Sequence, residues 1–128
     1  MSRIRILLAD PNASMLAMTT ELLGEECEIV GAVQTGPDLL CCLSETQPDI
    51  VLLDVVLGDI NGLGLGNEVH TRSPATKILY FTMYEGLAFV DAAFAAGASG
   101  YVFKSQASTD LLKAVRAVCR GEQFRPTG

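Results

Sequence analysis

A short apolar run that ends in a carboxylate is the feature that most constrains the fold of this chain. Residues 50–53 (Ile-Val-Leu-Leu) follow Pro48-Asp49 without a polar interruption, and Asp54 comes directly after them. A strand with one wet face alternates apolar and polar residues, whereas a continuous run is typical of a parallel strand covered on both faces. Because an unpaired charge is too costly to bury in such a core, we expect Asp54 at the carboxyl end of the strand, where open α/β sheets bind ligands. Taken alone, Asp54 could equally be a residue that caps the next turn.

The rest of the chain alternates between short apolar segments and stretches with helical spacing. Strands are predicted at residues 4–9, 28–33, 50–53, 77–81 and 100–103. Helices are predicted at about residues 13–24, 36–45, 61–72, 85–96 and 109–120. Caps are expected at Asn12, at the capping box that begins with Thr35, and at Ser108. Five strand–helix alternations predict an α/β fold: a flavodoxin-like, doubly wound parallel sheet of five strands in the order 2-1-3-4-5, with five helices.

Glycine alternates with other residues in the segment 61–66 (Asn-Gly-Leu-Gly-Leu-Gly). The pattern fits neither the G-x-G-x-x-G loop nor the Walker loop, and it does not follow its strand directly. We interpret the segment as the first turns of a helix. Each glycine weakens a helix by about 1 kcal/mol relative to alanine, so this helix is expected to be the most frayed of the five.

The chain has 128 residues, which is enough for one domain with its own core. We place that domain at residues 1–121 and interpret residues 122–128 as the start of a linker. A net charge of −6 argues against a generic polyanion-binding surface. No apolar run is long enough for a membrane span, and the four cysteines include no C-x-x-C pair. We therefore expect a cytoplasmic protein with reduced thiols and no membrane contact.

Polar side chains follow four of the five predicted strands at the point where each strand ends. They are Asp10, Asp54, Thr82 and Lys104. In the predicted strand order these ends lie side by side. Two neighbouring carboxylates repel each other and favour a cation such as Mg²⁺, which accepts one or two carboxylates and keeps several waters. A lysine can neutralise a carboxylate or a phosphoryl group, and a threonine hydroxyl can donate to a phosphoryl oxygen. The set therefore suits phosphoryl transfer onto an aspartate beside a metal.

Four segments resemble the signature of the response-regulator receiver domain of two-component signalling. They are Leu7-Leu8-Ala9-Asp10, Ile50-Val51-Leu52-Leu53-Asp54, Phe81-Thr82 and Gly100-Tyr101-Val102-Phe103-Lys104. The resemblance covers nearly the whole chain, and its most specific part is the Asp-Thr-Lys trio with a tyrosine three residues before the lysine. The ending at residues 117–122 (Ala-Val-Cys-Arg-Gly-Glu) is similar to receivers of the NarL/FixJ (LuxR-type) class.

The resemblance implies that Asp54 accepts a phosphoryl group from a sensor histidine kinase or a phosphotransfer protein. It also implies Mg²⁺ bound by Asp10, Asp54 and the backbone carbonyl of Val56. A receiver of this kind is not an enzyme, although it can assist its own phosphorylation and dephosphorylation.

The resemblance further implies that Thr82 and Lys104 contact the phosphoryl group and that Thr82 forms a conformational switch with Tyr101. LuxR-type receivers continue through a linker into a helix-turn-helix DNA-binding domain, which is missing from these 128 residues. Control of transcription and contact with DNA are therefore expected only through that missing domain. A homodimer is possible.

Four positions depart from the family's pattern: Pro11, Gly58, Asp59 and Ser105. Pro11 stands where receivers usually carry a second acidic residue, so one metal carboxylate is missing. Asp59 could partly replace that charge, although we favour a position facing solvent. Ser105 stands where many receivers carry a proline, often cis, so no cis bond is expected there. Pro11 keeps open the alternative of a degenerate receiver, a protein-interaction module that works without phosphorylation.

Other readings of the same architecture fit the residues less well. A haloacid-dehalogenase-type phosphatase needs a second aspartate where Val56 stands, and a flavodoxin needs a phosphate loop that residues 11–14 do not supply. His70 is the only histidine and has no partner near it in sequence, so we assign it no catalytic role. The helix expected at 85–96 is unusually apolar. It could form a dimer or output surface, or it could pack closely under its own loops.

Overall fold

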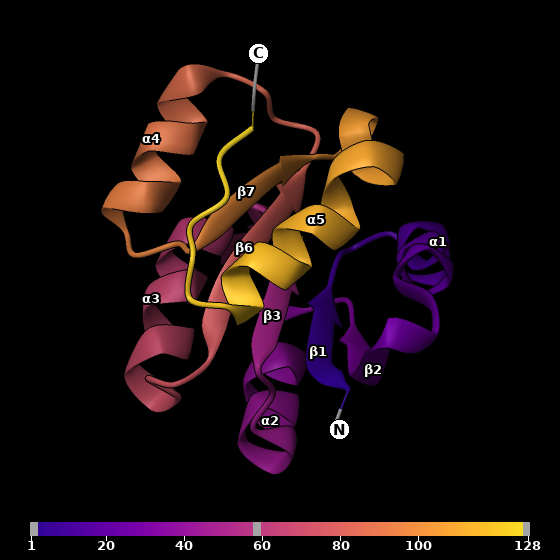
Figure 1. Cartoon of the computed structure of the whole chain (residues 1–128). Helices are drawn as coiled ribbons and strands as arrows, with labels where there is room; N and C mark the ends of the chain where they lie inside the picture. The colour runs from indigo at the N-terminus through magenta and orange to yellow at the C-terminus, as the bar shows by residue number, and fades with distance from the viewer. Residues whose placement is uncertain (1–2, 58–59, 127–128) are drawn as a thin grey trace.

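Five parallel strands form the central sheet of the protein, as the computed structural model shows for residues 3–57 and 60–126 (Figure 1). They are β1 (Ile4–Ala9), β2 (Cys27–Val33), β3 (Ile50–Leu53), β6 (Lys77–Thr82) and β7 (Gly100–Phe103). Their order is β2-β1-β3-β6-β7, and every neighbouring pair is parallel. This is the predicted order of the five sheet strands. Two short strands, β4 (Val56–Leu57) and β5 (Ile60–Asn61), pair antiparallel outside this sheet.

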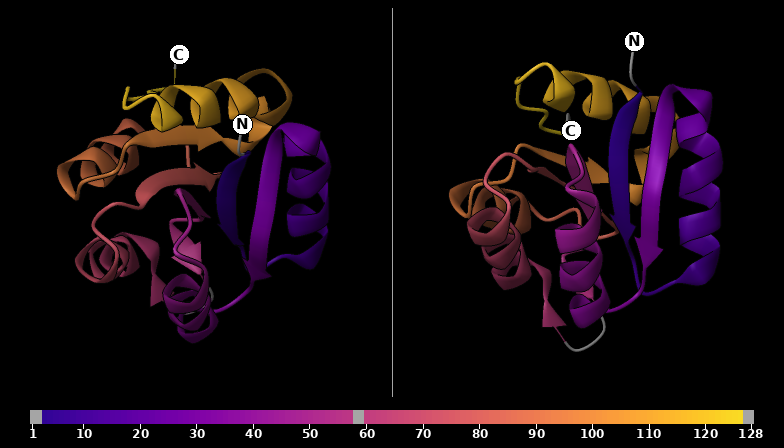
Figure 2. Two further views of the ribbon diagram at one scale, coloured as in Figure 1. Left: turned by 60° about the horizontal axis from the view of Figure 1, so that its bottom comes forward. Right: turned by 90° about the horizontal axis from the view of Figure 1, so that it is seen from below.

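Within these described residues, five α-helices are present, and they cover both faces of the sheet (Figures 1 and 2). They are α1 (Ala13–Leu23), α2 (Gly36–Thr46), α3 (Gly62–Arg72), α4 (Leu87–Ala95) and α5 (Ala107–Cys119). The helices α2, α3 and α4 bury side chains in one core layer, including Leu43, Val69 and Val90. The helices α1 and α5 bury Leu23 and Val115 in the other. The doubly wound α/β fold is confirmed. Within residues 3–57 and 60–126, no helix has both the length and the apolar character needed to cross a membrane.

Two of the three predicted helix caps are present. Asn12 Oδ1 accepts a hydrogen bond of 3.0 Å from the N–H of Met15 at the start of α1. Thr35 Oγ1 accepts one of 3.2 Å from the N–H of Asp38 at the start of α2. Each cap satisfies a backbone donor that has no partner inside its helix.

The cap predicted at Ser108 is wrong. Helix α5 begins at Ala107, and Gln106 occupies the cap position without a side-chain hydrogen bond. A 3₁₀ turn at Lys104–Gln106 precedes the helix, and the N–H of Ala107 donates to the carbonyl of Lys104. Helical hydrogen bonding therefore starts before Ser108, and this early turn replaces the side-chain cap.

Helix α4 buries only Val90 and Ala93. Leu87 is 69% exposed and Phe89 is 43% exposed. Close packing of this helix under its own loops is therefore wrong. A role for it as a dimer or output surface stays a prediction.

The segment that follows α5 packs against the domain. The N–H of Phe124 donates to the carbonyl of Ser99, and the carbonyl of Phe124 accepts from the N–H of Tyr101, both at 3.0 Å. The guanidinium of Arg125 lies 4.4 Å from the centroid of the Phe94 ring in α4. Figure 1 shows this yellow segment running between α4 and α5. The division into a domain and a linker after α5 stays a prediction, but the first residues beyond α5 lie on the sheet edge.

Candidate functional site

Three strands of the sheet end in side chains buried in the same core layer, the one formed with α2, α3 and α4. They are Ala9, Leu53 and Phe103. Successive side chains along a strand point to opposite faces of the sheet. The next residues, Asp10, Asp54 and Lys104, therefore turn toward the face covered by α1 and α5. The strand ends are also level, because the N–H of Asp54 donates to the carbonyl of Ala9 at 3.2 Å.

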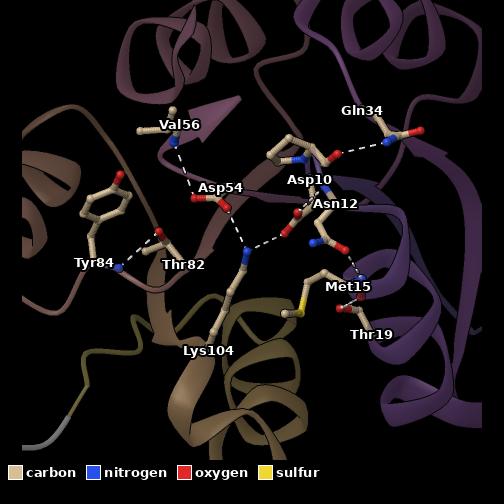
Figure 3. A network of polar contacts seen from close by, with 11 residues as sticks. Asp10, Asn12, Met15, Thr19, Gln34, Asp54, Val56, Thr82, Tyr84 and Lys104 are labelled. Carbon is tan, nitrogen blue, oxygen red and sulfur yellow. Dashed lines mark hydrogen bonds and ion pairs between the residues drawn. The ribbon is translucent and has the colours of Figure 1, made fainter. Parts of the chain in front are cut away.

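Lys104 lies between the two carboxylates at the end of the sheet (Figure 3). Its Nζ is 2.7 Å from Asp10 Oδ2 and 2.8 Å from Asp54 Oδ2. Asp10 is 5% exposed and Asp54 is 7% exposed, so both charges are largely removed from water. Desolvation lowers the pKa of Lys104, but its hydrogen bonds to the two carboxylates outweigh this effect and raise the pKa above its usual value. The cluster therefore combines two negative charges with one permanent positive charge.

The second oxygen of each carboxylate has a different partner. Asp10 Oδ1 accepts a hydrogen bond of 2.9 Å from the N–H of Asn12. Asp54 Oδ1 is 3.4 Å from the N–H of Val56, and a hydrogen bond of that length is weak. Among the carboxylate oxygens of the cluster, Asp54 Oδ1 therefore has the longest and weakest hydrogen bond, so a new bond at this atom disrupts the existing contacts least.

Thr82 ends strand β6 but does not join the ionic cluster. Phe81 belongs to the core layer of α1 and α5, so Thr82 faces the opposite layer. Its side chain is fully buried, and its Oγ1 accepts a long hydrogen bond of 3.4 Å from the N–H of Tyr84 (Figure 3). In the part of the chain that the structure describes, no hydrogen bond or ion pair connects Thr82 with Asp54 or Lys104.

Tyr101 is fully buried in β7. Its hydroxyl donates to the backbone carbonyl of Tyr84 at 2.7 Å. Burial, together with the negative charge of Asp54, raises the pKa of Tyr101 to about 12. Thr82 and Tyr101, the two predicted switch residues, therefore contact the same residue, one through its N–H and the other through its carbonyl.

Val56 begins the short strand β4, where it lies opposite Asn61 of β5. Its N–H points to the Asp54 carboxylate. The residue whose carbonyl is the predicted metal ligand therefore lies next to the predicted acceptor. Gly58 and Asp59 lie outside the described residues, so the solvent-facing position of Asp59 stays a prediction.

Pro11 brings no carboxylate to the cluster. Its carbonyl accepts a hydrogen bond of 2.9 Å from Gln34 Nε2. Within residues 3–57 and 60–126, no group of three or more His, Cys, Asp or Glu side chains is placed to hold a metal ion.

Ser105 Oγ donates to Glu85 Oε2 at 2.6 Å, and none of the described peptide bonds is cis.

Sequence reasoning missed Tyr80 and Tyr84 as neighbours of the site. The Tyr80 hydroxyl donates to the carbonyl of Gly62 at 3.0 Å, and its ring centroid is 6.2 Å from that of Tyr101. Tyr80 lies inside an apolar strand. The sequence pattern of such a strand shows that its aromatic ring is buried but not which group its hydroxyl contacts. Tyr84 acts through its backbone, which has no sequence signature. His70 is exposed on α3.

Comparison with known protein sequences identifies the family. The family described as "Response regulator receiver domain" matches residues 6–116. The "Uncharacterized transcriptional regulatory protein YxjL" of Bacillus subtilis is 28% identical over 122 residues. The "Response regulator GacA" of Pseudomonas aeruginosa is 29% identical over 123 residues. Each alignment covers 94% of this chain but only 56% and 58% of the respective relative, so the chain spans less than two thirds of their length.

Solved structures agree with this match. The crystal structure of a two-component response regulator of the LuxR family from Aurantimonas sp. SI85-9A1 is 32% identical, with a TM-score of 0.91, and the match covers 96% of this chain and 89% of that one. The isolated REC domain of RcsB from Salmonella enterica serovar Typhimurium, in the presence of phosphomimetic BeF3−, is 25% identical, with a TM-score of 0.89 and coverage of 98% and 94%. The chain belongs to the response regulator receiver domain family, and its relatives are response regulators of the NarL/LuxR type.

Proposed function

We propose that this domain is the phosphoacceptor of a two-component response regulator, in which Asp54 receives a phosphoryl group from a sensor histidine kinase or a phosphotransfer protein. The observation that supports it most directly is the Lys104 ammonium, 2.7 Å from Asp10 and 2.8 Å from Asp54. A carboxylate nucleophile beside a fixed positive charge, at the carboxyl edge of a parallel sheet, suits phosphoryl transfer. The domain is a signalling module and not an enzyme, and it at most assists its own phosphorylation and dephosphorylation.

Asp54 Oδ1 is the attacking atom in this proposal. Its contact with the Val56 N–H is long, at 3.4 Å, whereas Oδ2 is held by Lys104. The new bond joins Oδ1 to phosphorus while the P–N bond to the donor imidazole breaks, and the bonding electrons and a proton go to the imidazole. Lys104 stays protonated, because its two carboxylate partners raise its pKa, and its charge offsets part of the charge that the phosphoryl group brings.

The oxygen donors present fit Mg²⁺. Asp10 and Asp54 already converge on one cation, the Lys104 ammonium, and carboxylate and carbonyl oxygens are the ligands that this metal accepts. Asp10, Asp54 and the backbone carbonyl of Val56 are the proposed ligands. When bound, the metal neutralises charge on the transferring phosphoryl group. Because Pro11 brings no third carboxylate, we expect weaker metal binding than three carboxylates would give.

Thr82 and Tyr101 form the proposed switch. The Thr82 hydroxyl gives up only a long hydrogen bond, 3.4 Å from the Tyr84 N–H, when it turns to a phosphoryl oxygen. The phosphoryl group adds strong acceptors. A movement of the Tyr84 backbone also changes the hydrogen bond that its carbonyl accepts from Tyr101. The surface next to α4 is the part of the molecule that this movement alters.

The proposed output is control of transcription in the cytoplasm, through a C-terminal DNA-binding domain that is not among these 128 residues. The relative YxjL is named a transcriptional regulatory protein. The chain spans only 56% to 58% of the relatives compared, which leaves room in them for a further domain. Contact with DNA would come only through that domain, and a homodimer of the receiver stays a prediction.

Asp54→Asn tests the proposed acceptor, because it removes the nucleophilic carboxylate and keeps the size of the side chain. With acetyl phosphate and MgCl₂, we expect the wild-type chain to gain one phosphoryl group and the variant to gain none, as measured by intact-mass spectrometry. Asp49→Asn is the matched control. Asp49 accepts from the N–H of Arg5 before β3 begins, so the adduct should still form. A wild-type chain without an adduct at high donor concentration would contradict the proposal.

Pro11 supports one alternative, a degenerate receiver that acts as a phosphorylation-independent protein-interaction module. In this reading Lys104 is the permanent cation of the cluster, and no metal is needed. The two readings differ in their response to magnesium. A Mg²⁺ titration that leaves the amide NMR signals of Asp10 and Asp54 unshifted would favour the alternative, whereas saturable shifts at both residues would favour the phosphoacceptor.

A further inference from the structure

The first residue of α3 lies directly against the backbone of the proposed acceptor. The N–H of Gly62 donates to the carbonyl of Val55 at 2.7 Å. A Cβ at Gly62 would overlap the carbonyl oxygen of Asp54 and would lie 2.7 Å from the Val55 backbone. Only a residue without a side chain allows this approach. Gly62 therefore packs directly against the backbone of residues 54–55, and Asn61 just before it pairs with Val56.

Tyr80 holds Gly62 from the other side. It lies in β6, next to Leu53 of β3, and its buried hydroxyl donates to the carbonyl of Gly62 at 3.0 Å. A Cβ at Gly66 would overlap this hydroxyl, whereas the ring carbon Cζ would be 3.5 Å away. The absence of a side chain at Gly66 is therefore what gives the Tyr80 hydroxyl its place beside α3.

The ring of Tyr80 also reaches the proposed switch. Its centroid is 6.2 Å from that of Tyr101, whose hydroxyl donates to the carbonyl of Tyr84. One buried side chain thus contacts both the helix that supports the acceptor backbone and the tyrosine that contacts the loop before α4. No other described tyrosine donates to α3.

We infer that Tyr80 is a positioning residue for the acceptor site. Through its hydrogen bond to Gly62 it holds the backbone of residues 54–56, and with it the Val56 carbonyl, in the place where that carbonyl can serve Mg²⁺. The inference rests on the proposed function and adds a residue that acts on it without touching metal or phosphoryl group. Loss of the Tyr80 hydroxyl leaves the buried Gly62 carbonyl without this partner and loosens the backbone beside Asp54.

Tyr80→Phe tests the inference, because it removes one oxygen and keeps the ring. We expect the Mg²⁺ concentration for half-maximal phosphorylation by acetyl phosphate to rise about fivefold, the equivalent of one net hydrogen bond. The rate at saturating Mg²⁺ should stay close to the wild-type rate. Amide hydrogen exchange of the free protein is the second readout, and the Gly62 N–H should exchange faster in the variant.

Thr76→Val is the matched control. The Thr76 hydroxyl is also buried and donates to a backbone carbonyl, that of Pro48, at 2.8 Å. Thr76 precedes β6, whereas Tyr80 lies near its other end. The control variant should lose stability, but its Mg²⁺ dependence and its Gly62 exchange should match the wild type. A change of both readouts in Thr76→Val would show a general effect of stability and would overturn the inference.

Gly66→Ala approaches the same hydrogen bond from the helix. Its new methyl group should displace the Tyr80 hydroxyl and raise the Mg²⁺ requirement as Tyr80→Phe does. In the Tyr80→Phe background the oxygen is gone, and Gly66→Ala should have no additional effect. Additive effects in the double variant, or wild-type readouts in Tyr80→Phe, would overturn the inference. A wild-type chain that takes no phosphoryl group would instead refute the proposed function, and the exchange of Gly62 would still report on Tyr80.

Discussion

The backbone of Tyr84 connects the two side chains of the proposed switch. Its N–H contacts Thr82 Oγ1, and its carbonyl accepts from the Tyr101 hydroxyl. A displacement of either side chain therefore acts on the backbone of the same residue. The neighbouring side chains of Met83 and Leu87 are 70% and 69% exposed, so a change in this loop alters an apolar surface that a partner can contact.

Tyr101 should make the stability of the domain fall at high pH. Its pKa is raised from 10.0 to about 12 by burial and by the charge of Asp54. Between these pH values the folded chain retains a proton that the unfolded chain has lost. The free energy of unfolding should therefore fall by about 1.4 kcal/mol per pH unit from this group alone. The contribution is complete below pH 10 and is lost as the pH rises through about 12.

Urea unfolding of the wild type and of Tyr101→Phe, between pH 9 and about pH 11.5, checks this prediction. The wild type should lose stability more steeply than the variant. The pKa values of Tyr80 and Lys104 are also raised, and both groups are present in both proteins. Burial is the larger cause for Tyr80 and the charge of Tyr101 the smaller one, so most of the Tyr80 contribution is common to the two proteins. Parallel curves for the two proteins would contradict the prediction.

The ionic cluster could be predicted from sequence because each of its members directly follows an apolar strand. The alternation of side chains then places Asp10, Asp54 and Lys104 on one face of the sheet. Thr82 is the last residue of β6, and its side chain points to the other face of the sheet. The position of a residue at a strand end does not by itself reveal which face its side chain takes. The contact of Tyr80 with Gly62 depends on the distance between α3 and the sheet, which no local pattern encodes.

At the scale of elements, two glycines of helix α3 have different surroundings. Gly64 has open space where a side chain would lie, whereas a Cβ at Gly66 would overlap the Tyr80 hydroxyl. Gly64→Ala should raise the free energy of unfolding by up to about 1 kcal/mol, the usual helix propensity difference. Gly66→Ala should lower it by about 1–3 kcal/mol because the new methyl group overpacks a filled site.

Urea unfolding of both alanine variants at neutral pH measures the contrast. The two substitutions are chemically identical and share a helix, so each serves as the control for the other. An equal gain in stability for both variants would contradict the prediction, because it would show that the Tyr80 side chain moves aside without a loss of folding free energy. The expectation that α3 is the most frayed helix stays a prediction.

The helices themselves were predicted more reliably than their first residues. Asn12 and Thr35 follow strands and have free backbone donors within reach, so their caps could be predicted from residue type and spacing. The cap predicted at Ser108 is wrong because the 3₁₀ turn at Lys104–Gln106 already begins the helical hydrogen bonding. That turn begins at Lys104, the residue that pairs with the two carboxylates, so a tertiary ion pair accompanies the local change.

At the scale of the whole molecule, the segment after α5 adds to the edge of the sheet. Phe124 packs against the core layer of α1 and α5, and a Cβ at Gly100 would lie 3.5 Å from the Phe124 Cβ. Phe124→Ala should lower the free energy of unfolding by about 2 kcal/mol, less than for a fully buried phenylalanine because the ring is half-buried.

Gln123→Ala is the control for Phe124→Ala, since Gln123 is exposed and should change stability by less than about 0.5 kcal/mol. Thermal unfolding followed by circular dichroism measures both variants. A wild-type melting temperature for Phe124→Ala would show that the segment contributes nothing to the fold.

The architecture could be predicted from sequence, whereas the path of the chain after α5 could not. Five apolar runs alternating with helical stretches leave few ways to cover a parallel sheet on both faces. Residues 122–126 have a polar, turn-like composition that predicts no strand. Their pairing depends on β7 being an edge strand with unpaired backbone groups, which is a property of the finished sheet.

The pairing of Phe124 with Tyr101 matters for anyone who attaches a fluorescent reporter to this chain. A label joined after residue 126 starts from an anchor on the sheet edge beside α4, where Arg125 contacts Phe94. A label joined directly after Gly121 would start at the end of α5 and lose that attachment, so the choice of fusion point decides what the reporter senses.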